Sequence, residues 1–167
     1  QAYSACLRGQ LSSNVRPQNT MPPTPSETET RVLRILSDFQ MLELCLKLYI
    51  TSVYKFIQSK VEDRVPFKFS YKDIESYPLE RLLGTFVKLN SNENLQRRLN
   101  ALREKRNLVA HRGLVYRHAL VRELLEVDGE AYHSDLRAIE AEVDECLVLM
   151  GKELEIALAL QTPPAAA

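Results

Sequence analysis

Two charged residues, Arg106 and Glu43, stand where the sequence leads us to expect apolar ones. Arg106 interrupts an apolar series that steps along a helix by four, three and seven residues, namely Leu95, Leu99, Leu102 and Val109. An unpaired buried charge costs several kcal/mol, so this guanidinium must be paired or must face a cleft. Because Glu43 breaks the apolar stripe of an earlier helix in the same way, we predict that the two residues meet. A carboxylate can hold the arginine fork by two hydrogen bonds and leave donors free for a phosphate.

Two further polar residues, Asn107 and His111, follow Arg106 in the same helix. They are four residues apart and share one side of a helix. Arg106 and His111 are five residues apart, so on an ideal helix their side chains diverge by about 140°. They therefore cannot form one tight site on a straight helix by themselves. Either the helix is irregular before Gly113, or both residues line a cleft that another copy of the chain completes.

This run, an arginine followed by a polar residue and then a histidine late in a helix of an all-α chain, resembles the motif of HEPN domains. Here it reads Arg106, Asn107, three small or apolar residues and His111, and it follows a long helix that carries Glu43. The resemblance covers about residues 30–160. It implies metal-independent ribonuclease activity in a homodimer, in which the motifs of both protomers face one composite cleft.

The resemblance also implies a role for each residue of the motif. RNA supplies its own nucleophile, the 2′-hydroxyl, and His111 would act as general acid or base. Arg106 would stabilise the charge that gathers on the phosphate oxygens, and Asn107 would orient the histidine or the phosphate. Single-stranded RNA is the expected substrate, a 2′,3′-cyclic phosphate and a 5′-hydroxyl are the expected products, and DNA should be inert. No cofactor and no metal ion are expected.

One position departs from part of the family. Members that pair with nucleotidyltransferase antitoxins carry a tyrosine two residues after the histidine, where this chain has Gly113, and the nearest tyrosine is Tyr116. Two functions therefore stay open. The first is a ribonuclease that serves as a toxin or defence effector, with an antitoxin or regulatory protein as partner. The second is a catalytically inactive helical module that binds a protein, a nucleotide or nucleic acid.

Charge is segregated along the chain, although the net charge is zero. Residues 97–122 hold eight basic side chains and one acid, whereas residues 123–155 hold eleven acids and two bases. The basic segment could attract phosphates, or it could pair with the acidic one. The candidate RNA-binding residues are Arg97, Arg98, Arg103, Lys105 and Arg112, for which a solvated helix face is an equal alternative.

Apolar residues recur every three or four positions, which predicts an all-α fold, an antiparallel bundle of four or five helices. The expected helices cover residues 29–62, 79–89, 93–111, 117–127 and 135–160. The Asn90-Ser91-Asn92 segment is expected to cap the third helix, with Gly113 near its end, and 63–78 is a connection that leaves the first helix and returns. Residues 41–54 are apolar nearly all round, which is typical of a central helix.

The bundle is expected to span residues 31–160, between a proline-rich flexible arm at 1–30 and a disordered tail at 161–167. Tyr49 and Tyr54 are expected in the core, and His118 and His133 on the surface. Cys6, Cys45 and Cys146 have no paired spacing, so we expect reduced thiols in a cytoplasmic protein. The sequence shows no metal-ligand spacing and no apolar run long enough to enter a membrane.

Overall fold

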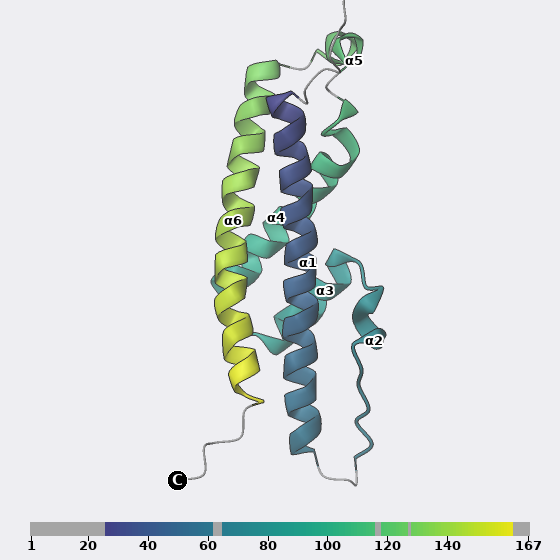
Figure 1. Cartoon of the computed structure of the whole chain (residues 1–167), viewed down its shortest axis with the longest axis vertical. Helices are drawn as coiled ribbons and strands as arrows, with labels where there is room; N and C mark the ends of the chain where they lie inside the picture. The colour runs from purple at the N-terminus through teal and green to yellow at the C-terminus, as the bar shows by residue number, and fades with distance from the viewer. Residues whose placement is uncertain (1–25, 62–64, 116–117, 127, 162–167) are drawn as a thin grey trace, which may run out of the picture.

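The computed structural model of the protein describes residues 26–61, 65–115, 118–126 and 128–161. Within these ranges it is all-α, as predicted, and contains no strand. Four helices build the bundle in Figure 1: α1 (Glu27–Lys60), α3 (Leu79–Leu89), α4 (Glu93–Arg112) and α6 (Gly129–Ala159). Two short helices complete it, α2 (Lys72–Glu75) within the predicted 63–78 connection and α5 (Ala119–Leu124) before α6. None of the helices in these ranges is long and apolar enough to cross a membrane.

Capping residues decide where the helices begin. The Ser26 hydroxyl accepts a hydrogen bond from the Glu29 N–H, and the Glu29 carboxylate accepts one from the Ser26 N–H. This capping box starts α1 at Glu27, so the prediction of a flexible arm up to residue 30 was wrong at its end. The tail prediction was wrong at Gln161, whose side-chain amide donates to the Ser52 carbonyl. Residues 1–25 and 162–167 lie outside the described part of the chain.

The last helix begins earlier than predicted. The Asp128 carboxylate accepts hydrogen bonds from the N–H groups of Glu130 and Ala131, so Asp128 is an N-cap. The predicted helix begins at residue 135, whereas α6 begins at Gly129, directly after its Asp128 cap. An aspartate before a glycine favours a turn and caps a helix equally well, because both conformations use the same side-chain acceptor.

The helices do not all run in alternate directions. Cross-helix contacts place Thr28 beside His133, Arg31 beside Glu140 and Ser52 beside Gln161, so α1 and α6 run parallel. The predicted antiparallel direction holds for α4 against α1, α3 and α6. Figure 1 shows the reason: the segment before α2 returns along α1 with little helix, so α1, α3 and α6 all run downward in the view and α4 runs upward.

The core is built from one side of each long helix. Leu95, Leu99, Leu102 and Val109 of α4 are all buried, as predicted. α1 contacts α3, α4 and α6, as expected of a central helix, but it is not covered on every side. Met41, Leu44 and Leu48 of its middle are 51%, 41% and 40% exposed, because the other helices cover only one side of α1.

Gly113 ends α4 for a reason that differs from the predicted one. Its backbone is right-handed, with φ −53° and ψ −42°, so it does not supply the left-handed conformation that often ends a helix. A Cβ atom at this position would lie 2.7 Å from a methyl carbon of Val32 in α1. The same Cβ atom would also lie 2.5 Å from the Val109 carbonyl oxygen of α4 itself, so a larger residue would clash with both helices.

Candidate functional site

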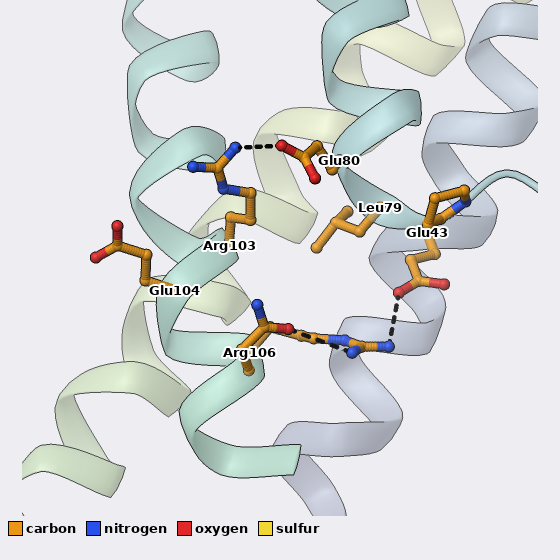
Figure 2. A pocket seen from close by; sticks show the side chains of 8 residues that line it. Glu43, Leu79, Glu80, Arg103, Glu104 and Arg106 are labelled. Carbon is orange, nitrogen blue, oxygen red and sulfur yellow. Dashed lines mark hydrogen bonds and ion pairs between the residues drawn. The ribbon is translucent and has the colours of Figure 1, made fainter. Parts of the chain in front are cut away.

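The structure brings Glu43 and Arg106 together, as predicted. The Arg106 Nη2 and Glu43 Oε1 atoms are 3.6 Å apart, and the contact joins α4 to α1 (Figure 2). The pair is not buried, because the two side chains are 40% and 22% exposed. The expected clamp of two hydrogen bonds was wrong, since one ion-pair contact joins the two groups. The remaining N–H donors of Arg106 are available to an anion, apart from a long contact of 3.5 Å from Nη1 to the side-chain amide oxygen Oδ1 of Asn107.

This ion pair lies beside a cavity of about 430 Å³ between α1, α3 and α4. The cavity is lined by Glu43, Pro78, Leu79, Glu80, Arg103, Glu104, Arg106 and Asn107. Figure 2 shows the Arg103 guanidinium turned toward Glu80, to which it donates at 2.9 Å. Three carboxylates and two guanidinium groups line the cavity, so its interior disfavours a phosphate.

His111 does not line this cavity. It lies exposed in the last turn of α4, and its ring makes no hydrogen bond or ion pair with any residue that the structure describes. α4 is a regular α-helix from Glu93 to Arg112, so the alternative in which the helix is irregular before Gly113 is wrong. Arg106 and His111 therefore keep their divergence of about 140°. One copy of the chain does not join them in one site.

The candidate RNA-binding residues differ in their surroundings. The Arg98 guanidinium donates to Glu142 at 2.8 Å and also to Glu145, both in α6. These hydrogen bonds raise the pKa of Arg98, and they lower the pKa of the Glu142 carboxyl. Arg98 therefore pairs with the acidic segment, which was the alternative to binding a phosphate.

Three other candidate RNA-binding residues, Arg97, Lys105 and Arg112, have fewer charged contacts than Arg98. Arg97 and Arg112 are exposed and form no ion pair within the described ranges. Lys105 is half-buried, and its positive charge contributes to the lowered pKa of Glu142. Arg112, next to His111, is thus the nearest exposed cation to the histidine in the sequence.

The described residues contain no cluster of three or more histidine, cysteine or acidic side chains that could hold a metal ion. Cys146 is buried, and burial raises the pKa of its thiol to about 11. Burial also raises the pKa of Cys45. Both thiols are therefore held in the protonated, weakly nucleophilic form. Cys6 and Tyr116 lie outside the described residues.

Sequence reasoning missed a second cavity. Tyr54, expected in the core, is half-buried and lines a space of about 620 Å³ together with Phe67, Phe69 and Tyr77. Tyr49 is buried, as expected, and donates to the Leu89 carbonyl. The signal in the sequence was the alternation of Phe67 and Phe69 around Lys68 within the 63–78 connection.

The comparisons with known proteins add no relative to this picture. The sequence matches no protein-family model, and it shows no significant similarity to a curated protein or to a solved structure.

Proposed function

We propose that this chain is a metal-independent endoribonuclease whose site is completed when two copies pair through the ends of their α4 helices. The observation that carries the proposal is the contact of Glu43 with Arg106, which orients a partly exposed guanidinium beside Asn107. A guanidinium held at one edge offers its other N–H donors to phosphate oxygens. The HEPN-like spacing of Arg106, Asn107 and His111 gives this arrangement its chemical interpretation.

In the proposed reaction, Arg106 of one copy and His111 of the other act on the same phosphate. The 2′-oxygen attacks phosphorus, and its proton passes to a histidine. The bond from phosphorus to the 5′-oxygen breaks, and that oxygen takes up a proton. The products are a 2′,3′-cyclic phosphate and a 5′-hydroxyl. Arg106 stabilises the extra negative charge on the phosphorane oxygens.

The surface around the motif supports pairing of two copies. Leu108, Leu114 and Val115 are 38%, 42% and 43% exposed at the end of α4. Large apolar side chains that surround a polar motif suit a surface that another protein surface covers. A second copy in this place would bring a second His111 toward the exposed edge of Arg106.

The first test is cleavage of labelled single-stranded RNA by the purified chain in EDTA. His111→Ala should lower the rate by roughly 10²–10⁴-fold, the usual contribution of a general acid or base. Its thermal stability should be unchanged, because the ring contacts no described partner. The matched control is His118→Ala, which removes an exposed histidine outside the motif and should cleave normally. Equal cleavage by His111→Ala, or activity that EDTA abolishes, would refute the proposal.

The second test asks whether the site is shared between copies. Arg106→Ala and His111→Ala should each be inactive alone, and mixing them should restore part of the activity. A mixed pair keeps one Arg106 and one His111 on different copies, so only a composite site is rescued. Light scattering that finds only monomers at tens of micromolar would count against it.

The specific geometry of His111 favours one other function, a helical binding module without catalysis. In a single copy His111 lies away from the cavity, and three carboxylates line that cavity. If intact RNA survives prolonged incubation with a verified dimer, the binding module is the better description. Its partner would then be a protein, a nucleotide or a nucleic acid.

A further inference from the structure

The second cavity, of about 620 Å³, lies between α1, α3 and the connection that returns beside α1 in Figure 1. Its lining residues are Tyr54, Phe67, Lys68, Phe69, Asp73, Ile74, Tyr77, Arg81, Gly84, Thr85 and Lys88. The volume falls within the range of small-molecule binding sites. None of these residues lines the cavity beside Arg106, so the two cavities are separate.

Aromatic rings form much of the wall. The Tyr54 ring packs at 4.7 Å from Phe69 and 5.8 Å from Phe67, measured between ring centroids, and all three rings stay partly exposed. The Arg81 guanidinium carbon lies 3.7 Å from the Tyr77 ring centroid, which makes a stacked, flat cationic surface. Aromatic rings and stacked arginine planes are the surfaces on which nucleic-acid bases stack.

The charge of the lining is positive. Lys68, Arg81 and Lys88 face one acid, Asp73, whose carboxylate already accepts a 2.7 Å hydrogen bond from the Ser70 N–H. Lys68 and Lys88 are exposed and form no ion pair within the described part of the chain. This excess of cations favours an anionic ligand, in contrast to the cavity beside Arg106, where carboxylates outnumber guanidinium groups.

Gly84 of α3 lines this cavity and offers a position at which its size can be changed. It lies inside α3, where glycine is a poor helix former, and its φ is not positive. A Cβ atom at this position would meet nothing within 4 Å. Neither packing nor backbone conformation therefore requires glycine here. A larger side chain can therefore be introduced at this position to narrow the cavity.

We propose that this cavity binds a nucleotide. The base stacks against the aromatic wall and the Tyr77–Arg81 surface, and the phosphate is held by Lys68 and Lys88. The same chemistry is offered by a free nucleotide and by an unpaired nucleotide of single-stranded RNA. The site uses none of Arg106, Asn107 and His111, so it goes beyond the proposed ribonuclease function and does not rest on it.

The test measures binding by calorimetry to the full chain carrying His111→Ala, so that cleavage does not interfere. The probes are AMP, a 2′-O-methyl oligoadenylate that resists cleavage, and ribose 5-phosphate, which lacks a base. We expect ribose 5-phosphate to bind at least about tenfold more weakly than the best nucleotide probe, because stacking is lost. Binding of AMP assigns the site to free nucleotides, and binding of the oligonucleotide alone assigns it to an RNA strand. If neither nucleotide probe binds, the proposal is overturned.

Variants locate the binding in this cavity. Gly84→Leu should weaken binding by about tenfold or more without lowering the melting temperature, because the new side chain enters open space. Gly151→Leu is the matched control, since a Cβ there also meets nothing within 4 Å and the position lies in α6, outside the cavity. Lys88→Glu, at an exposed position, should weaken binding without affecting folding. Unchanged affinity in both Gly84→Leu and Lys88→Glu would overturn the assignment.

Discussion

The contact between Glu43 and Arg106 makes a quantitative prediction about stability. At 3.6 Å, Coulomb's law gives an attraction of about 1.2 kcal/mol in water and about 4.6 kcal/mol at an effective dielectric constant of 20. Because the two side chains keep 22% and 40% of their surface exposed, solvent screening places the pair near the first figure. Fixing two long side chains offsets part of that attraction. We therefore expect a coupling energy of about 0.5–1 kcal/mol, below the 3–5 kcal/mol lost when a buried pair is broken.

A double-mutant cycle measures this coupling directly. Glu43→Gln, Arg106→Gln and the double variant keep the side chains near their original size, and urea unfolding gives the free energy of each protein. The coupling should fall in about 1 M NaCl, where the Debye length is about 3 Å. The more exposed Glu80–Arg103 pair, at 75% and 44% exposure, should couple more weakly.

The Glu142–Arg98 pair provides the opposite comparison, because its contact is shorter, at 2.8 Å, and its arginine is more shielded, at 24% exposure against 40% for Arg106. It should show the largest coupling of the three. A coupling above about 3 kcal/mol for Glu43 with Arg106, insensitive to salt, would refute the reasoning from exposure. It would mean that the pair is buried in solution. Repeating the cycle at dilutions that separate two copies would then identify a partner surface as the cause.

Two further predictions concern α1 and its neighbours. Gly113→Ala should lower the free energy of unfolding by about 1–3 kcal/mol, because its Cβ would lie 2.7 Å from Val32. The control Gly151→Ala should raise the melting temperature. Equal effects of the two substitutions would contradict the predicted clash with Val32. Burial, and then repulsion by Asp144, raise the pKa of Asp38. Since folding favours its protonated form, Asp38→Asn should raise the melting temperature at neutral pH and lose that gain as acid protonates the parent. An increase in melting temperature that does not change with pH would contradict the raised pKa of Asp38.

Much of α4 could be predicted because its signals are local. Asn92 caps it, the leucines step along one side, and Gly113 follows its end, so a short window contains the whole helix. The same local reasoning failed at Asp128, where one side chain fits both a turn and a cap. Tyr54 packs against the core, as expected, but it stays half-buried, and its contacts with the distant Phe67 and Phe69 are not visible in a local pattern.

The direction of the helices is a second property that local patterns do not contain. The apolar pattern of a helix indicates which side is buried, but it does not indicate the direction of the neighbouring helices. The parallel course of α1 and α6 follows from the segment between α1 and α3, which returns beside the lower part of α1 in Figure 1 with only one turn of helix. Similarly, the two cavities gather residues from three elements each, so their opposite charge appears only after folding.

The geometry of α4 links activity to assembly. Val109 is buried and Arg106 reaches α1, so this side of the helix is fixed by packing. On a regular helix His111 lies about 160° from Val109, on the side that faces away from the bundle. No side-chain rotation moves His111 into the cavity beside Arg106 while α4 stays docked. Cleavage that requires both residues must therefore use two copies. A monomer that cleaved RNA through both residues would contradict this argument, even if the ribonuclease activity itself were demonstrated.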